Sequence, residues 1–468
     1  MTILTTIVGD ILTASNTATV TNKTISRADN TLTVRMANDV SGTLPVTNGG
    51  TGQTSCFGEG EILIGNTTGN TLTKTTLTAG CNISVTNGNG SITIDYCVPI
   101  VYSNTIWGWG RNVCGQLGDN TTTGKSSPIS VIGGFTDWCQ VSAGVTSVAA
   151  VRSNGTAWAW GYNCVGGLGD NTTVNKSSPV SVVGGFTDWC QISMGCLHTF
   201  AVRSNGTAWA WGDGGQGRLG DNTSANKSSP VSVVGGFTDW SKVAASFAGG
   251  AGLRQNGTIW SWGQNTYGQL GDNTTVSKSS PVSVVGGFTD WCQVSASGKG
   301  NSDQHRSVAI RSNGTAWAWG NNRSGQLGDG TTTNRSSPVS VVGGFTDWCQ
   351  IEAGPNQVVA VRTTGTAWAW GYNVFGQLGD NTTSNKNSPV QVVGGFTNWC
   401  QLSGGRYNST GVRQNGTAWT WGNNNAGQLG TNNTTATSSP VSVVGGFTNW
   451  CHVSAGSYFQ VGIISTVV

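Results

Sequence analysis

The 468-residue sequence has little charge, little histidine and no long apolar run. Only 9% of its residues are charged, and the formal net charge of +3 comes without the clustered Lys and Arg that neutralise a nucleic-acid backbone. No apolar run approaches the roughly 18 residues that span a bilayer. These absences predict no nucleic-acid partner and no membrane insertion.

Catalytic and metal-binding patterns are also scarce. The chain has three His, and Glu352 is the single Glu after residue 98. No paired carboxylates, Cys-x-x-Cys motif or Gly-x-Ser-x-Gly elbow occurs. His198 could pair with Asp213, but a single His is more often structural than catalytic. We therefore predict no enzyme, no metal and no cofactor, with a glycan-cleaving enzyme as the weaker alternative.

The N-terminal region lacks the basic leader of a signal peptide and includes Asp10. We therefore expect a protein made and folded in the cytosol, with reduced thiols. Six of its twelve Cys fall at one equivalent place after a repeated Trp, where the third copy has Ser241. We interpret these six as small buried side chains: Cys139, Cys190, Cys292, Cys349, Cys400 and Cys451.

A four-residue signature, Trp-x-Trp-Gly, occurs seven times, at intervals of 51, 51, 51, 57, 51 and 51 residues. All 21 Trp lie in this array, three per copy, which sets a domain boundary near Val98. The copies start at Trp107, Trp158, Trp209, Trp260, Trp317, Trp368 and Trp419.

Each copy predicts about four short strands. Val148 to Trp160 reads as two β-type runs around Asn154-Gly155, the strongest two-residue hairpin signal. Four-stranded units with a period near 50 residues are typical of propeller blades. Residues 100–109 supply only the second half of a hairpin and residues 451–465 only a first half. We therefore predict an all-β, seven-bladed propeller over residues 99–468, closed by pairing of the array's two ends.

Residues 110–118 read Gly-Arg-Asn-Val-Cys-Gly-Gln-Leu-Gly. With most of their counterparts, they resemble the signature of regulator of chromosome condensation repeats, whose fold is a seven-bladed propeller. The resemblance covers about residues 99–468. The family often has His after Ala-Gly-x-x, where only His198 matches here, and the founder's exchange-factor activity does not follow from the fold.

Features shared by the copies indicate scaffold. Six copies carry an Asp followed six residues later by Lys or Arg, and both are Thr in the seventh. This pattern predicts ion pairs across a loop rather than a Ca²⁺ site, because each loop supplies one carboxylate. The pairs begin at Asp119, Asp170, Asp221, Asp272, Asp329 and Asp380.

The residues that differ most between copies lie just before the first strand of the hairpin and just after its second strand. The 57-residue interval places its six extra residues within 297–306, next to the first of these positions. Because a hairpin returns the chain to the end that it left, we predict one variable face. Planar rings among Asn and Gln suit a carbohydrate or protein surface, although drift among exposed loops would give the same pattern. The candidate binding residues are Arg111, Tyr162, Tyr267, Lys299, Asp303, His305, Arg306, Tyr372, Phe375, Arg406, Tyr407, Tyr458 and Phe459.

Residues 1–98 are rich in Thr, Asn and Gly, contain no Trp, and alternate apolar and polar residues in short runs, as at residues 83–85 and 92–94. This predicts a β-rich segment that buries surface by oligomerising. Residues 42–55 and 77–94 resemble segments of bacteriophage tail fibres. That resemblance implies a virion protein, commonly trimeric and attached to other virion proteins through its N-terminal part.

The sequence therefore favours a phage tail fibre or receptor-binding adhesin. Residues 1–98 would attach and oligomerise, and the propeller would display its variable face to a host glycan or protein with avidity from several copies. The alternative is a cytosolic scaffold whose propeller binds a protein.

Overall fold

The computed structural model describes residues 102–467, except residue 248 and residues 298–304, and the backbone of five strands before them. The chain divides into two compact units, Met1–Val101 and Tyr102–Val468. The first unit contains a three-stranded sheet, β1-β5-β4, and a two-stranded sheet, β2-β3. These strands are β1 (Leu32–Arg35), β2 (Glu61–Asn66), β3 (Thr71–Thr76), β4 (Ile83–Gly88) and β5 (Ser91–Tyr96). Our other predictions for residues 1–98 lie outside the described residues.

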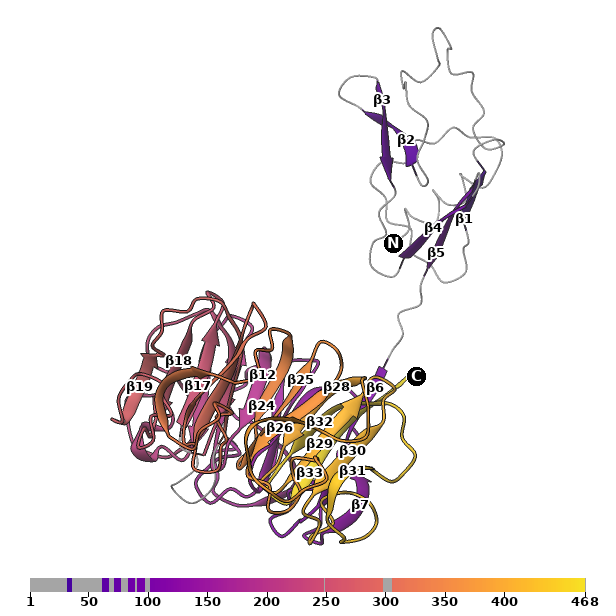
Figure 1. Ribbon diagram of the computed structural model, residues 1–468. Coiled ribbons are helices and arrows are strands. Elements are labelled where there is room, and N and C mark those ends of the chain that lie inside the picture. The colour runs from indigo at the N-terminus through magenta and orange to yellow at the C-terminus, as the bar shows by residue number, and fades with distance from the viewer. Residues whose placement is uncertain are drawn as a thin grey trace. The chain divides into compact units, whose positions relative to one another are not determined.

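The second unit is a propeller of seven four-stranded antiparallel blades, which confirms the predicted fold (Figure 1). The first strand of each blade lines the centre of the ring: β8 (Trp138–Ala143), β12 (Trp189–Met194), β16 (Trp240–Ala245), β20 (Trp291–Ser297), β24 (Trp348–Ala353), β28 (Trp399–Gly404) and β32 (Trp450–Ala455). The second strands are β9 (Ser147–Arg152), β13 (His198–Arg203), β17 (Gly249–Arg254), β21 (Arg306–Arg311), β25 (Gln357–Arg362), β29 (Asn408–Arg413) and β33 (Phe459–Val467).

The third strands are β10 (Ala157–Gly161), β14 (Ala208–Gly212), β18 (Ile259–Gly263), β22 (Ala316–Gly320), β26 (Ala367–Gly371), β30 (Ala418–Gly422) and β6 (Tyr102–Gly110). The fourth, outermost strands are β11 (Lys176–Ser181), β15 (Lys227–Ser232), β19 (Lys278–Ser283), β23 (Arg335–Ser340), β27 (Lys386–Gln391), β31 (Thr437–Ser442) and β7 (Lys125–Ser130). Each fourth strand contains a Pro, which an edge strand tolerates because one side of it makes no ladder bonds.

Helix is nearly absent from the described residues, where the single helical element is the short 3-10 turn η1 (Gly215–Gly217). Nothing helical in this part of the chain is long and apolar enough to cross a membrane.

The ring closes through a blade that both ends of the array build. Strand β33 pairs with β6 over nine residues, from Phe459 opposite Gly110 to Val467 opposite Tyr102. The resulting sheet has the order β32-β33-β6-β7. This confirms the predicted closure and removes the open edges that an unclosed ring would expose.

The core lies between blades rather than within them. One buried cluster, for example, combines Leu168 of one blade with Trp189 and Trp211 of the next. Burying an indole removes roughly 150–250 Å² from water, so these residues dominate the inter-blade contacts. The second Trp of every signature is completely buried: Trp109, Trp160, Trp211, Trp262, Trp319, Trp370 and Trp421.

The contact of Trp160 with the preceding blade shows how blades are joined. Its indole Nε1 donates to the carbonyl oxygen of Gln116 at 3.0 Å. A Cβ on Gly118 would lie 2.8 Å from that nitrogen, and Gly118 has a φ of +70°. The loop therefore needs glycine here for both space and backbone conformation. Equivalent bonds of 3.1, 3.0 and 2.9 Å run from Trp109 to Gln428, Trp370 to Gln326 and Trp421 to Gln377.

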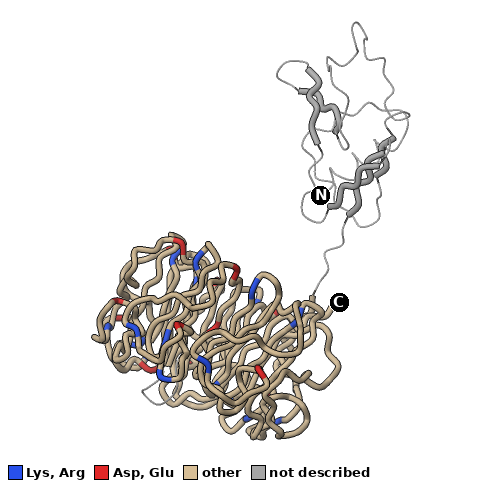
Figure 2. The backbone as a smooth tube through the Cα atoms, viewed as in Figure 1, with Lys and Arg blue, Asp and Glu red and all other residues tan. Residues whose placement is uncertain are grey.

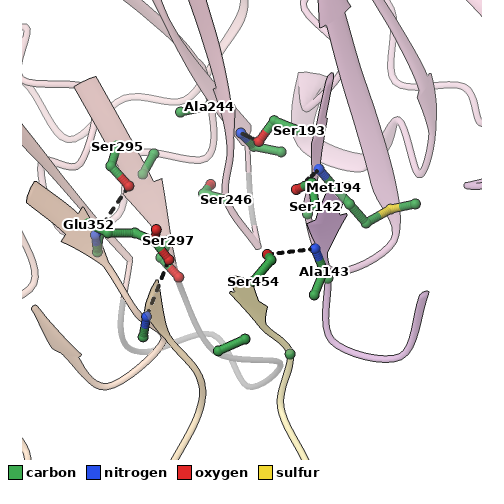
Figure 3. Close-up of a pocket in the computed structure, with 18 of the residues that line it drawn as sticks. Ser142, Ala143, Ser193, Met194, Ala244, Ser246, Ser295, Ser297, Glu352 and Ser454 are labelled. Atoms are coloured by element: carbon green, nitrogen blue, oxygen red, sulfur yellow. Dashed lines mark hydrogen bonds between the residues drawn. The ribbon is translucent and has the colours of Figure 1, made fainter. Parts of the chain in front are cut away.

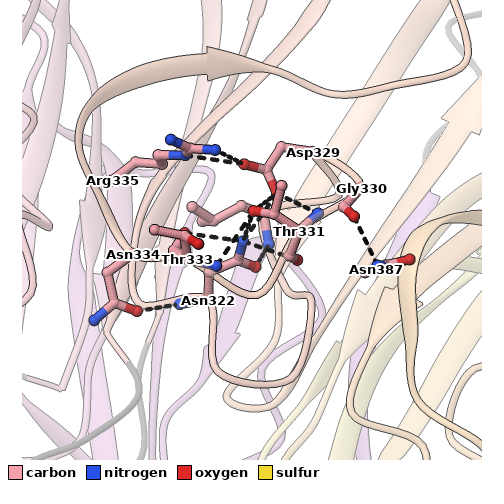
Figure 4. Close-up of polar contacts among 9 residues, drawn as sticks. Asn322, Asp329, Gly330, Thr331, Thr333, Asn334, Arg335 and Asn387 are labelled. Atoms are coloured by element: carbon pink, nitrogen blue, oxygen red, sulfur yellow. Dashed lines mark hydrogen bonds and ion pairs between the residues drawn. The ribbon is translucent and has the colours of Figure 1, made fainter.

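A buried Asn organises the loop after the third strand (Figure 4). The side-chain amide of Asn322 donates to Asp329 Oδ1 at 2.9 Å and to the carbonyl oxygens of Thr331 and Thr333, each at 3.1 Å. The Asp–Lys/Arg pairs were predicted as part of this scaffold, and four of the six lie within 4.0 Å. They are Asp170–Lys176, Asp221–Lys227, Asp329–Arg335 and Asp380–Lys386.

The six equivalent Cys are exposed, so the prediction that they are buried is wrong. A β-bulge lies between Trp138, which faces the core, and Gln140, which faces the ring centre. The bulge turns the intervening Cys139 toward solvent, where its Sγ donates to the carbonyl oxygen of Val151 at 3.3 Å. Every Cys in the described part of the chain is a free thiol.

Replacing Gly118 by Ala tests the inter-blade contact. We expect Gly118→Ala to lower the free energy of unfolding by about 1–3 kcal/mol more than Gly134→Ala, because only the first methyl group meets an indole. Gly134 is a matched control, since its φ is +67° and a Cβ there would have no atom within 4 Å. Denaturant midpoints compare the two variants, and equal losses would contradict this account of blade packing.

Candidate functional site

The two sets of variable positions lie on one face of the propeller, as predicted. In each blade this face is formed by the turn between the first and second strands and the loop between the third and fourth. The backbone joins the two segments: Tyr162 N donates to Thr146 O at 3.0 Å, and Arg111 N donates to Tyr458 O at 2.8 Å. We call it the variable face. The hairpin turns, such as Asn154-Gly155, lie on the opposite face.

Six predicted residues converge on the variable face and form what we call the aromatic–arginine patch: Arg111, Tyr372, Phe375, Arg406, Tyr407 and Tyr458. Tyr407 is central, with ring centroids 4.8 Å from Phe375, 5.9 Å from Tyr458 and 6.3 Å from Tyr372. The Arg406 guanidinium lies 5.1 Å from the Tyr407 centroid. Arg111 lies 5.7 Å from the Tyr458 centroid.

Three successive blades supply the patch. Tyr372 and Phe375 follow β26, and Arg406 and Tyr407 form part of the turn between β28 and β29. The closing blade supplies Tyr458 from its C-terminal half and Arg111 from its N-terminal half. Ring closure is therefore needed to complete the patch. Arg111 is exposed, and the other five side chains are half-buried.

The two cations of the patch have no acidic partner in the part of the chain that the structure describes. Within the described residues, neither Arg111 nor Arg406 has a carboxylate oxygen within 4.0 Å. By contrast, Arg152, at the opposite end of a second strand, pairs with Asp137 at 2.7 Å while lying over a Phe ring. Charge is sparse over the whole propeller (Figure 2), so two uncompensated guanidinium groups among aromatic rings distinguish this part of the surface.

Two predicted Tyr lie on the variable face outside the patch. Tyr267 lies beside Arg323, whose guanidinium is 5.4 Å from its ring centroid. Tyr162 lies near Cys164, and a hydrogen bond with that thiol, together with burial, raises the pKa of Tyr162 to about 12. Lys299 and Asp303 lie outside the described residues.

Three other candidates are buried, so the structure excludes their side chains from any contact surface. His305 and Arg306 are 1% exposed and Phe459 is 0% exposed. The Arg306 guanidinium donates to the carbonyl oxygen of Gln357 at 2.9 Å and to that of Gly354. Burial lowers the pKa of Arg306 to about 9. The ring of His305 stacks on Phe247, with centroids 5.2 Å apart.

Variation at the start of the second strands has a structural cause that the sequence did not reveal. These side chains join successive blades: His198 Nε2 lies 3.1 Å from Gly249 O, and Gln357 Nε2 donates to Asn408 O at 2.9 Å. Burial lowers the pKa of His198 to about 4. Asp213, the suggested partner of His198, forms an ion pair with Arg218 instead. Variation at the start of the second strands therefore changes the contacts between blades and not the exposed surface.

The first strands surround a central cavity of about 300 Å³, which Figure 3 shows with the serines and Glu352 that line it. The cavity extends to turn residues of the variable face, including Val145 and Pro355. Two of its lining residues, Lys242 and Glu352, were not predicted as site residues. Both depart from their counterparts, which are mostly Gln at the first position and Ser at the second. A comparison of the copies at these positions would have identified them.

The titratable groups of the described residues do not assemble into a metal site. No three His, Cys, Asp or Glu side chains in this part of the chain are grouped so that they could hold a metal ion.

Comparisons with known proteins agree with this fold. Residues 50–392 match the family described as the RCC1-like domain, and residues 415–463 match the regulator of chromosome condensation (RCC1) repeat. The structures of human WBSCR16 and of Prp20p from Saccharomyces cerevisiae align with TM-scores of 0.69, at 18% and 19% identity. These alignments cover 78% of this chain, and 100% and 92% of those chains respectively.

Two curated relatives show similar levels of sequence identity. The E3 ubiquitin-protein ligase HERC2 of Homo sapiens is 27% identical over 356 residues, which cover 74% of this chain. The ultraviolet-B receptor UVR8 of Arabidopsis thaliana is 26% identical over 344 residues, covering 72% of this chain and 76% of the receptor. The chain spans only 7% of the length of HERC2.

Substitution of two arginines separates buried from exposed variable positions. We expect Arg306→Ala to lower the free energy of unfolding by about 2–4 kcal/mol, because it leaves carbonyl oxygens without their charged donor. Arg111→Ala should change it by less than about 0.5 kcal/mol, because that side chain is exposed. Denaturant unfolding measures both, and a small effect of Arg306→Ala would contradict its assignment to the scaffold.

Proposed function

Because the chain belongs to the family of RCC1-like domains, we propose that its propeller is a protein-binding module that docks an acidic protein segment on the aromatic–arginine patch. The proposal rests on the surroundings of two residues, Arg111 and Arg406. Both guanidinium groups lie over Tyr rings, and neither has a carboxylate within 4.0 Å among the described residues.

The composition of the patch suits a protein interface. Tyr and Arg are enriched among the residues that contribute most to binding, because planar groups supply contact area at a small entropic cost. An Asp or Glu of the partner would supply the missing counter-charge. Tyr407 would provide the apolar centre, since Phe375, Tyr372 and Tyr458 already surround and orient its ring.

Structures of other propellers of this shape support a role in protein binding. The structure of Prp20p is described together with its binding to Gsp1p and histones, and a second structure shows Kap60 bound to yeast RCC1 (Prp20). At 19% identity or less these similarities concern the fold, so no particular partner is carried over. The ligase activity in the name of HERC2 is not carried over either, because the chain spans 7% of that protein.

The tail-fibre hypothesis concerns where such a module acts. It depends on the resemblance of residues 42–55 and 77–94 to fibre segments and on an attachment role for residues 1–98. Location in a virion and trimer formation therefore stay predictions. In that setting the docked partner would be a host-surface protein, and the aromatic–arginine patch would be its binding site.

Selection from a random peptide library tests the chemistry of the patch. We expect the wild-type chain to enrich peptides that carry several Asp and Glu residues, and the Arg111→Glu/Arg406→Glu variant to lose this enrichment. Salt should weaken the binding, because exposed charge pairs are screened.

Arg323→Glu is the matched control. It reverses the charge of another Arg that lies over a Tyr ring on the variable face but outside the patch. Acidic peptides should still bind this variant. Enrichment of acidic peptides by the double variant, or their loss from the Arg323→Glu control alone, would contradict the proposal.

A further inference from the structure

Glutamine side chains join the first strands around the central cavity. Gln140 Oε1 accepts from Ile192 N at 2.8 Å, and its Nε2 donates to Ile192 O at 3.1 Å. The side-chain amide thereby forms with Ile192 the two hydrogen bonds that the backbone of a neighbouring strand would form. The same two-bond clamp joins Gln191 to Val243, Gln350 to Leu402 and Gln401 to Val453.

A second series, made of serines, faces the same cavity two residues further along each strand. Their hydroxyl oxygens accept backbone N–H bonds from the next blade at 2.9–3.1 Å. A hydroxyl that accepts such a bond keeps its own proton, and within the described residues these serines donate it to no protein group. Four serines are in this state: Ser142, Ser193, Ser295 and Ser454.

Both series are interrupted in β16. Lys242 occupies the Gln position and Ala244 the Ser position, so neither can form these bonds to Val294 and Ala296 of the next blade. Lys242 has no hydrogen bond or ion pair with another described residue. Burial lowers the pKa of Lys242, which means that the ammonium group is poorly solvated there. At this position the glutamine clamp is therefore missing, and a cation with unfavourable solvation lies in the cavity wall instead.

The other titratable groups of the cavity wall do not neutralise Lys242 with a close carboxylate. His452 is neutral by its bonding, since its Nδ1 accepts from Gln401 Nε2 at 3.1 Å and its Nε2 donates to Val141 O at 3.0 Å. Glu352 accepts from Ser403 Oγ at 2.6 Å and from Gly404 N at 3.2 Å. Burial raises the pKa of Glu352 to about 7, although its hydrogen bonds and the charge of Lys242 act in the opposite direction. Glu352 therefore attracts Lys242 across the cavity but forms no ion pair with it within 4.0 Å.

We propose that the central cavity binds a small anion, a phosphate or carboxylate group, held by Lys242 Nζ and by the hydroxyl protons of the cavity serines. Lys is a common phosphate ligand as a point charge, and a shielded site strengthens the attraction. The cavity volume of about 300 Å³ matches the lower end of small-molecule sites. The cavity extends to the variable face, which gives the anion a route of entry.

The repeat itself supplies the test variant. Lys242→Gln installs the residue that five other copies carry, so the variant should fold and gain the missing clamp to Val294. With inorganic phosphate as the probe, calorimetry should show saturable binding to the wild-type chain and at least tenfold weaker binding to Lys242→Gln. Lys278→Gln, at the start of the outer strand β19, should bind phosphate as the wild type does.

A crystal structure with phosphate gives the location. The phosphate should lie within hydrogen-bond distance of Lys242 Nζ inside the cavity. Absence of saturable binding, equal affinity in Lys242→Gln, or phosphate bound only outside the cavity would each overturn the proposal. Should Lys242→Gln prove unstable in a thermal melt, Lys242→Met replaces it, with the same expected loss of binding.

Discussion

The packing of an indole from each blade against the loop of the preceding blade is the interaction on which this propeller depends. A single four-stranded blade has two apolar faces and can bury neither alone. Trp160 packs against Gln116 and Gly118 of the preceding blade and thereby fixes the distance between the two blades. The last of these contacts, Trp109 with Gln428, joins the first part of the array to the last, so the core is complete only in the closed ring.

Both candidate sites also form only when the ring is closed. The aromatic–arginine patch contains Arg111 and Tyr458, which come from opposite ends of the array and meet in the closing blade. The central cavity has the first strands of all the blades as its wall, including β32 of that same closing blade. A scaffold of nearly identical units thus creates two places where single residues can act. Neither place exists in an isolated blade.

The sequence predicted the fold well, because the Trp-x-Trp-Gly signature recurs in all seven copies and Asn-Gly turns in five of them, and both indicate local structure. It also predicted that both variable segments lie at the same end of each blade, and its thirteen candidates include the six residues of the patch, whose role in binding stays a prediction. It failed at His305, Arg306 and Phe459, because a position can vary in order to fit a neighbouring blade as well as to fit a partner. Burial, which separates these cases, depends on contacts between residues about 50 positions apart. Lys242 and Glu352 were missed although both differ from their counterparts in the other copies, because it is the ring geometry that shows that these positions face one cavity.

Hydrogen–deuterium exchange on the chain with and without a peptide rich in Asp and Glu tests the central claim most directly. We expect slower exchange in the loops that hold the patch, with the Asn-Gly hairpin turns of the opposite face unchanged. The patch residues are Arg111, Tyr372, Phe375, Arg406, Tyr407 and Tyr458. Protection of the opposite face would contradict the assignment of binding to the aromatic–arginine patch. Equal protection of the variable face in all blades would contradict it as well.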